Sequence, residues 1–530
     1  MRRFRPDLIV AAVATVGPLY VASRSFGLGF PLDDAWIHMV YGDALARHGT
    51  LAYNDGIAAT GSTAPLWTVV AAVAHVVAGG PAPSMSAAFA LKVFGVLFHV
   101  LAALLAMHLA QALVRRRGKV LAGLCAGALV AVVPPTVYGA VSGMEVPLAS
   151  ALLLAAPLFA IHRRAWLAGA AAGLAVATRP EAAVVVPFVC AMVALDSGRR
   201  VARTLVTLSG AVVPPAAILI RNQLVSGRPL PATFYAKADL SRPALEALRV
   251  GLVDTLGSVR PVSSPILWGL VATALVFGAH AARRAAHVRR VTVTVRRGGQ
   301  LTAITAAALA YAAGASLVMQ MKIPYEFYYQ RYVLPCVPLL VVASVVAITL
   351  SVDATRARWR LALAMTVLTA MFGFEVADLP RQRDVYAYGV GAANSIQVKI
   401  GKFIAEQLPM DAVVWSVDAG AVRYFGRRRV VDLMRLNTPD LIHDGKVRKG
   451  WWPDSIVVVP SVFTATASPP LVVALVARVD GDPNPGSVQT QVVYRCGSGA
   501  VPGDPENKVG VSALGRFIAV GRCARAEDPP

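Results

Sequence analysis

The sequence predicts an α-helical polytopic membrane bundle with about eleven transmembrane helices, followed by a C-terminal α/β domain outside the cytoplasm. Hydrophobic residues make up 56% of the chain, charged residues only 15%, and the mean hydropathy is +0.59, which is too apolar for a soluble protein of this length. Apolar runs recur up to about residue 376, and alternating strand-like and helix-like segments follow. We therefore expect a transmembrane domain at 1–377, with an external loop at 28–86, and a soluble domain at 378–530.

Each expected span is an apolar run bounded by charged residues. The spans are 8–27, 87–113, 120–134, 145–161, 165–178, 182–196, 204–220, 264–281, 301–320, 333–350 and 359–376. The short spans are rich in Ala and Gly, which allow helices to pack closely. The first run has no small-residue cleavage site, so we expect a retained span and not a cleaved signal.

Basic residues fix the predicted orientation, because short cytoplasmic loops carry an excess of Lys and Arg. If the apolar stretch 64–79 does not cross the membrane, six basic clusters lie on one side, at 2–5, 115–119, 163–164, 199–203, 283–297 and 356–360. They hold 21 Lys and Arg, with only Asp196 and Asp353 beside them, so they account for most of the net charge of +22. The high pI is thus a topology signal and not a nucleic-acid footprint. The N-terminus is expected in the cytoplasm.

The same orientation places the 28–86 loop, the loops 135–144, 221–262 and 321–332, and the C-terminal domain outside the cytoplasm. Strands are expected there at 412–417, 429–433, 456–459, 472–477, 488–494 and 517–520, with an amphipathic helix at 395–408. Cys496 and Cys523 lie in this domain, where a disulfide and two free thiols are both open alternatives. The domain contains no phosphate-binding loop and no metal-spaced Cys/His set. It is expected to bind an acceptor or to stabilise the protein.

Asp33 and Asp34 follow the first span directly. A carboxylate pair near lipid is costly, so it favours a chemical role over a packing role. Capping of the helix that starts here is the alternative. On that helix, Asp34, His38 and Tyr41 share one face. Asn54 and Asp55 are most simply turn residues.

An ordered series of short motifs runs along nearly the whole chain. It consists of Leu32-Asp33-Asp34-Ala35, Tyr53-Asn54-Asp55-Gly56, Gly61-Ser62-Thr63-Ala64-Pro65-Leu66-Trp67, Ser142-Gly143-Met144-Glu145, Thr178-Arg179-Pro180-Glu181, Pro231-Ala232-Thr233-Phe234-Tyr235-Ala236-Lys237, Arg331-Tyr332-Val333-Leu334-Pro335 and Asp418-Ala419-Gly420-Ala421. With this series the chain resembles the multispanning glycosyltransferases of the C superfamily, most closely the bacterial members related to arabinofuranosyl- and mannosyltransferases.

The resemblance implies an inverting transfer of a sugar from a polyprenyl-phosphate donor to a glycan, glycolipid or glycoprotein acceptor of the cell envelope, at a bacterial cytoplasmic membrane. Such a transfer needs a base for the acceptor hydroxyl, and by analogy Asp33 is that base, with Asp34 second. The leaving phosphate needs a cation, and the candidates are Arg179, Lys237, Arg331 and Arg221. For Arg179 the simpler alternative is an ion pair with Glu181.

Further candidates concern the sugar and a metal ion. The expected substrate-binding residues are His38, Tyr235, Glu326, Tyr329 and Glu181, since aromatic and polar side chains suit sugar recognition. His38 is alternatively a structural residue or a metal ligand. A divalent cation as cofactor stays open, because two carboxylates and a histidine do not define a site.

Two other classes of function are compatible with a polytopic chain. A transporter would hold charges near the midplane in internal repeats, and no repeat is detected here. A non-catalytic envelope assembly protein would use the bundle only as an anchor for the C-terminal domain.

Overall fold

The structure is a computed structural model. It describes residues 5–25, 29–114, 118–195, 200–237, 292–318, 331–353 and 358–443, and shorter C-terminal segments between 446 and 525. Its contacts divide the chain into two compact units. Unit 1 contains Met1–Ser23, Val93–Leu219 and Lys237–Asp384, and unit 2 contains Arg24–Lys92, Ile220–Ala236 and Val385–Pro530. The 28–86 loop therefore belongs to the same unit as the C-terminal region. The domain boundary at 377/378 stays a prediction.

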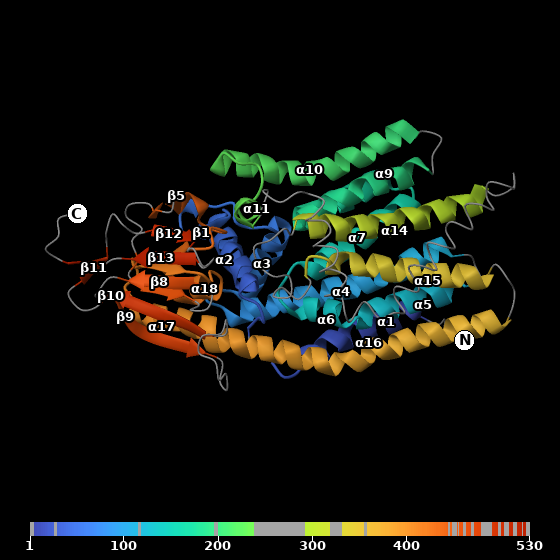
Figure 1. Ribbon diagram of the computed structural model, residues 1–530. Helices are drawn as coiled ribbons and strands as arrows, with labels where there is room; N and C mark the ends of the chain where they lie inside the picture. Colours follow the sequence, from blue (N-terminus) through green and yellow to red (C-terminus); the bar gives the residue numbers. More distant parts are fainter. Residues whose placement is uncertain are drawn as a thin grey trace. The chain divides into compact units, whose positions relative to one another are not determined.

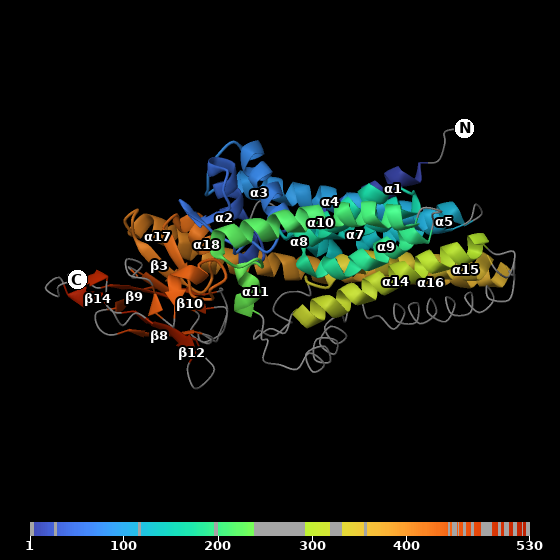
Figure 2. The same cartoon turned by 90° about the horizontal axis from the view of Figure 1, so that it is seen from above.

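Unit 1 is built from apolar helices that run alongside one another (Figures 1 and 2). They are α1 (Pro6–Ala22), α4 (Met85–Leu113), α5 (Lys119–Val132), α6 (Pro134–Val141), α7 (Val146–Ile161), α8 (Ala165–Thr178), α9 (Val186–Ala194), α10 (Arg200–Ser226), α14 (Thr292–Val318), α15 (Val337–Asp353) and α16 (Arg358–Ala393). Helix α7 packs on α8 and α9, and α14 packs on α9 and α15. The boundaries between the units fall inside α4, α10 and α16.

The expected spans coincide with these helices, apart from 264–281, which lies outside the described residues. In the part of the chain that the structure describes, α4 and α10 are long and apolar enough to cross a membrane. The pair α5 and α6, bent by 59°, adds a third candidate if it forms one span. Six shorter apolar segments accompany them, as in multi-pass membrane proteins.

Two segments differ from the expectation. The loop expected at 135–144 is mostly helical, because Pro134 and Pro135 occupy the first turn of α6, where their missing N–H groups cost nothing. Helix α16 continues past residue 376 to Ala393, and a π-helical turn at Asn394–Val398 joins it to α17 (Lys399–Gln407). The amphipathic segment predicted at 395–408 therefore extends a long helix and does not begin a new one.

Unit 2 combines the 28–86 loop with the C-terminal strands. Its loop part contains α2 (Asp33–His48), a hairpin of β1 (Ala52–Asn54) and β2 (Ile57–Ala58), and α3 (Pro65–Ala78). Helix α2 packs on α3 and on α18 (Ala421–Gly426), and α18 packs on α17. Helix α11 (Ala232–Lys237) lies in unit 2 except for its last residue.

The C-terminal strands form a mixed α/β region. One sheet has the order β4-β3-β7-β10-β9, with β3 (Val413–Ser416) parallel to both β4 (Arg429–Asp432) and β7 (Ser455–Val458). Antiparallel β10 (Thr490–Cys496) and β9 (Leu471–Arg478) extend it. The second sheet has the order β5-β6-β12-β13-β8, with strands Ile442–His443, Lys446–Val447, Lys508–Val511, Phe517–Gly521 and Phe463–Ala467, and β11 (Ala500–Pro502) pairs with β14 (Cys523–Arg525). Every expected strand is present. Helix α18 connects parallel β3 and β4.

Candidate active site

Helix α2 carries the aspartate pair in its first turn. Asp33 and Asp34 are its first two residues, Arg47 and His48 lie in its last turn, and Gly49 ends it in the left-handed region at φ 67°. Acidic residues at the start and basic residues at the end complement the helix dipole, so local electrostatics explain why a helix forms here.

The carboxylate of Asp33 does not cap its own helix. Its Oδ2 accepts a hydrogen bond from the Gly420 N–H and its Oδ1 accepts one from the Ala421 N–H, both at 2.7 Å. These N–H groups lie at the N-terminus of α18, where they have no partner within the helix. For Asp33, the alternative of capping its own helix is therefore wrong, and the carboxylate caps α18 of the C-terminal region instead.

Gly420 is required by this close approach. A Cβ atom at position 420 would lie against the backbone oxygen of Asp33 and 2.8 Å from its Oδ2. Any other residue would push the start of α18 away from Asp33. The tight spacing therefore explains a glycine directly before α18.

A second carboxylate, that of Asp418, is close enough for its charge to act on Asp33. Burial and the negative charges of Asp418 and Asp34 raise the pKa of Asp33 well above its ordinary value, against the effect of its two N–H donors. Asp418 is itself oriented, since its Oδ2 accepts a hydrogen bond from Gln397 Nε2 at 2.8 Å. A raised pKa makes Asp33 a stronger base once it is ionised.

The 28–86 loop is fastened to the C-terminal region around this cluster. Tyr53 donates its hydroxyl to the Ala419 carbonyl at 2.6 Å. The Asn54 side chain exchanges two hydrogen bonds with the backbone of Val430 in β4, at 2.8 and 2.9 Å. Asn54 is therefore more than the turn residue expected from the sequence.

Aromatic packing adds to this attachment. The Trp36 ring lies 4.8 to 5.2 Å, centroid to centroid, from the rings of Phe30, Tyr424 and Phe425. Trp36 is fully buried, so α2 is fixed against α18 by a large apolar contact.

Asp432, at the end of β4, organises the loop that follows. It accepts hydrogen bonds from the N–H groups of Met434, Leu436 and Asn437 and from the Asn437 side chain. Burial raises its pKa to about 6 in spite of these donors. Gly61 fits beside this loop, since a Cβ there would meet the Leu436 carbonyl at 2.6 Å.

Three predicted substrate or phosphate residues are also in unit 2. His38 is buried on α2. Arg221 donates hydrogen bonds to the Leu51 and Ala59 carbonyls at 3.0 and 2.9 Å, which binds it to the β1–β2 hairpin. Tyr235 is exposed, and the Arg228 guanidinium lies 5.2 Å from its ring centre.

Unit 1 holds a buried cationic cluster around Arg179. Arg179 forms an ion pair with Glu145 at 2.9 Å and donates a hydrogen bond to the Arg331 carbonyl. Arg179 and Arg331 both lie over the Tyr332 ring, at 4.5 and 5.1 Å from its centre. Glu181 is buried nearby and acts on Arg179 through its charge, but the close ion pair is with Glu145.

The remaining candidates lie outside the described residues. These are Glu326 and Tyr329, together with the side chain of Lys237 and the side chains of Cys496 and Cys523. Their roles stay predictions.

Solved structures with a similar arrangement come from two enzymes. The oligosaccharyltransferase AglB of Archaeoglobus fulgidus, in complex with an inhibitory peptide and a dolichol-phosphate, is 14% identical with a TM-score of 0.52, over 85% of this chain and 69% of that one. ArnT of Cupriavidus metallidurans, bound to undecaprenyl phosphate, is 16% identical with a TM-score of 0.51, over 92% of this chain and 97% of that one. In the crystal structure of the Archaeoglobus enzyme with Zn and sulfate, this chain covers only 62% of the length.

The chain shares the fold of these glycosyltransferases. This similarity confirms the resemblance to the C superfamily at the level of the fold. A family model for a domain of unknown function, DUF8728, matches residues 384–500. None of the curated proteins matches the chain in sequence.

No site for a resident metal ion is defined among the described residues. Among them, no group of three or more His, Cys, Asp or Glu side chains is arranged to hold one. The Zn in the Archaeoglobus complex belongs to that protein, and we derive no step through a metal here.

Sequence reasoning missed Asp418, Gln397 and Lys92. Lys92 is buried in α4, with its ammonium 5.7 Å from the Phe30 ring centre and 5.8 Å from that of Tyr386. A lysine inside an apolar run is the signal that would have identified it. For Asp418, the signal was the Asp418-Ala419-Gly420-Ala421 motif, which the sequence alone could not connect to Asp33.

Proposed function

We propose that the protein is a membrane glycosyltransferase that moves a sugar from a polyprenyl-phosphate donor to a cell-envelope acceptor on the extracytoplasmic face. The observation that carries the proposal is the Asp33 carboxylate, held by the Gly420 and Ala421 N–H groups beside Asp418. The fold shared with AglB and ArnT supports it.

In this mechanism Asp33 acts as the general base. One carboxylate oxygen takes the proton of the acceptor hydroxyl, and the hydroxyl oxygen attacks the anomeric carbon of the donor. The new glycosidic bond forms as the bond from that carbon to the phosphate oxygen breaks, so polyprenyl phosphate leaves and the configuration inverts. Each oxygen of Asp33 accepts one N–H and keeps a lone pair for this proton.

Cationic groups would stabilise the negative charge on the leaving phosphate. Arg221, Lys237, Arg179 and Arg331 keep the role that the sequence assigned to them, and Lys92 joins them because it is a buried ammonium. A buried guanidinium or ammonium interacts with phosphate more strongly than one in bulk water, because the local dielectric constant is lower. His38, Tyr235, Glu181, Glu326 and Tyr329 are proposed to contact the sugar or the acceptor.

The deciding experiment measures release of polyprenyl phosphate by the purified full chain with a panel of polyprenyl-phosphate sugars and envelope acceptors. Asp33→Asn should reduce turnover by about 10²- to 10⁴-fold, the range that a general base contributes. Asp411→Asn is the matched control, since Asp411 is an exposed aspartate of the same unit.

The amide introduced by Asp33→Asn would face at least one backbone N–H with its own NH₂ group, so folding must be checked by thermal unfolding in the same samples. Turnover per folded molecule is the quantity compared. Unchanged turnover in Asp33→Asn, combined with loss in Asp34→Asn, would move the base to Asp34. No release from any donor and acceptor pair would contradict the proposed function.

A further inference from the structure

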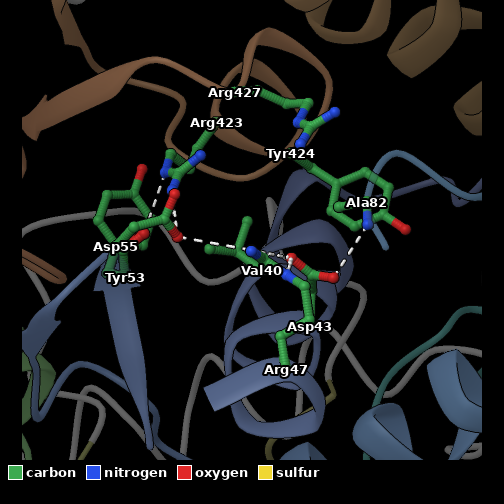
Figure 3. Close-up of a pocket in the computed structure, with 9 residues that line it drawn as sticks. All are labelled: Val40, Asp43, Arg47, Tyr53, Asp55, Ala82, Arg423, Tyr424 and Arg427. Atoms are coloured by element: carbon green, nitrogen blue, oxygen red, sulfur yellow. Dashed lines mark hydrogen bonds and ion pairs between the residues drawn. The ribbon is translucent and has the colours of Figure 1, made fainter. Parts of the chain in front are cut away.

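A separate pocket lies in unit 2, lined by α2, β1, α18 and the residues around Ala82 (Figure 3). About 340 Å³ of empty space lies between its lining atoms, open solvent included, of which about 20 Å³ can hold the centre of a water molecule. Its charged lining consists of Arg47, Arg423, Arg427, Asp43 and Asp55. Neither member of the Asp33/Asp34 pair contributes to this lining.

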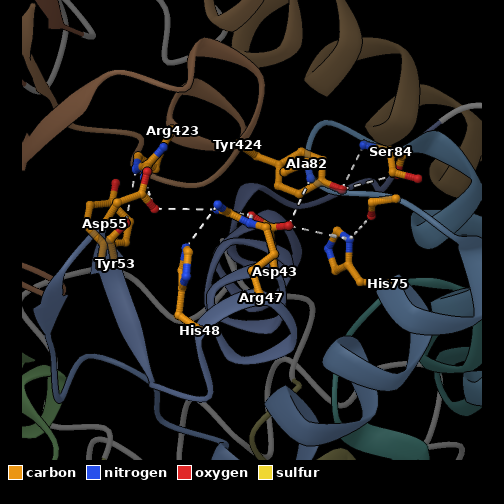
Figure 4. Close-up of polar contacts among 11 residues, drawn as sticks. Asp43, Arg47, His48, Tyr53, Asp55, His75, Ala82, Ser84, Arg423 and Tyr424 are labelled. Atoms are coloured by element: carbon orange, nitrogen blue, oxygen red, sulfur yellow. Dashed lines mark hydrogen bonds and ion pairs between the residues drawn. The ribbon is translucent and has the colours of Figure 1, made fainter. Parts of the chain in front are cut away.

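The Asp43 carboxylate accepts three hydrogen bonds from within the protein. Its Oδ2 accepts hydrogen bonds from Arg47 Nε and Nη2 at 2.8 and 2.5 Å, and its Oδ1 accepts one from the Ala82 N–H at 2.9 Å (Figure 4). Asp43 is also buried. Its carboxylate therefore holds α2 to the loop between α3 and α4 and positions Arg47.

Asp55 is a weaker ion-pair partner for the arginines than Asp43 is. Its carboxylate is 58% exposed, and it contacts Arg423 at 3.2 Å and Arg47 at 3.5 Å. One solvated carboxylate is thus shared between two guanidinium groups. Exposed pairs of this kind contribute little to stability and can be exchanged for another anion.

Arg427 supplies a third guanidinium, and it is exposed. It adopts the left-handed backbone at φ 53° that ends α18. This backbone conformation is not by itself a sign of ligand binding, since Arg435 also has it, at φ 60°. What distinguishes Arg427 is that its side chain lines the pocket with Arg423 and Arg47 (Figure 3).

The pocket lining therefore carries one more positive than negative charge. Three guanidinium groups accompany two carboxylates, and one of these carboxylates is buried and already accepts three hydrogen bonds. Planar guanidinium groups that converge on one space suit phosphate or carboxylate oxygens.

The position of the pocket indicates what carries this anion. Val40 and Asp43 follow Asp33 by seven and ten residues on α2, which places them about 10 to 15 Å along the helix axis. Helix α18 likewise contacts Asp33 at its first turn and the pocket with Arg423 and Tyr424. Asp33 and the pocket thus lie along the same two helices, and a group bound in the pocket is within reach of an extended acceptor whose hydroxyl is at Asp33.

We propose that this pocket binds an anionic group, a phosphate or a carboxylate, carried by the acceptor glycan. The assignment to the acceptor rests on the proposed function, whereas anion binding by the pocket does not. The pocket would thus select acidic acceptors over neutral ones.

The first test needs no turnover. The full chain in detergent is unfolded thermally with increasing inorganic phosphate, against sodium chloride of equal ionic strength. Phosphate should raise the unfolding temperature of the native chain and of Arg435→Gln, and should have no effect on Arg427→Gln. Arg435 is the matched control because it is an exposed arginine of the same unit with the same backbone conformation. A phosphate effect that persists in Arg427→Gln, or that is missing in the native chain, overturns the proposal.

The second test assigns the anion. In the transfer assay, Arg427→Gln should raise KM for a phosphate- or carboxylate-bearing acceptor by about tenfold, the loss expected for one charged hydrogen bond, with donor KM unchanged. A neutral acceptor should show no change. If vesicles of phosphatidylglycerol replace phosphate in the first test and acceptor KM does not move, the ligand is a lipid headgroup and the acceptor assignment is wrong.

The two proposals fail in different ways. Phosphate stabilisation that depends on Arg427, without sugar transfer under any condition, would confirm an anion pocket and contradict the glycosyltransferase. Sugar transfer with an acceptor KM that is independent of Arg427 would support the glycosyltransferase and contradict the assignment of the anion to the acceptor.

Discussion

Asp33 combines two opposing influences on one carboxylate. Two backbone N–H groups favour its ionised form, while burial and the charges of Asp418 and Asp34 disfavour it, and the second effect dominates. A base must be ionised to work, so its pKa sets the lowest pH at which the proposed reaction proceeds.

Turnover should therefore rise with pH along a limb located above the ordinary pKa of aspartate. Asp418→Asn removes one of the charges that raise the pKa of Asp33, so this limb should move to lower pH. The side-chain carbonyl introduced by this substitution can still accept the hydrogen bond from Gln397. The measurement is kcat/KM against pH for the native chain, Asp418→Asn and Asp411→Asn, and an unmoved limb in Asp418→Asn would show that Asp33 is not the titrating base.

The sequence predicted only part of these residue contacts. The pattern identified Asp33 and Asp34, because a carboxylate pair beside an apolar run is unusual. For Arg179, a phosphate-binding candidate, it offered an ion pair with the neighbouring Glu181 as the alternative, whereas the close ion pair is with Glu145. Spacing in the sequence identifies residues that are close along the chain, whereas Arg179 and Glu145 come together only in the folded protein.

At the scale of elements, the N-terminus of α18 is the part that completes the Asp33 cluster. The N–H groups of Gly420, directly before this six-residue helix, and of Ala421, its first residue, both bind the Asp33 carboxylate. Strands β3 and β4 precede and follow the helix and hold it in place. Hydropathy and alternation predicted these strands. Nothing local in the sequence could pair α18 with α2.

Gly420→Ala should disturb this junction without adding or removing charge. The new Cβ would meet the Asp33 backbone, at a cost of about 1–3 kcal/mol in the free energy of unfolding, as for other overpacked sites. Turnover should fall together with the free energy of unfolding.

Gly391→Ala is the control, because a Cβ at 391, on α16, would meet nothing within 4 Å. Alanine is the better helix former there, so the unfolding temperature should stay equal or rise. Thermal unfolding and turnover of both variants check this. If Gly420→Ala behaves like Gly391→Ala, the close approach at Gly420 does not limit the site.

At the scale of the molecule, the apolar helices agree with the expected spans because length and hydropathy are properties of each segment alone. Which loops face which side depends on the distribution of basic residues in short loops. The orientation is therefore a separate prediction from the fold.

This prediction can be checked in cells with single cysteines placed in a chain whose five native cysteines are replaced. Ala526→Cys, in the C-terminal domain, should react with a membrane-impermeant thiol reagent in intact cells. Ala286→Cys, within the basic cluster 283–297, should react only after permeabilisation. The reverse pattern of labelling would show that the predicted orientation is wrong.

The N–H groups that hold Asp33 belong to residues made long after it, since Gly420 follows Asp33 by 387 positions. During synthesis, the ribosome completes every expected span before Gly420 emerges. Under the proposed mechanism, a growing chain that is already inserted therefore has no assembled base, and transfer of lipid-linked sugars would begin only when translation is almost finished.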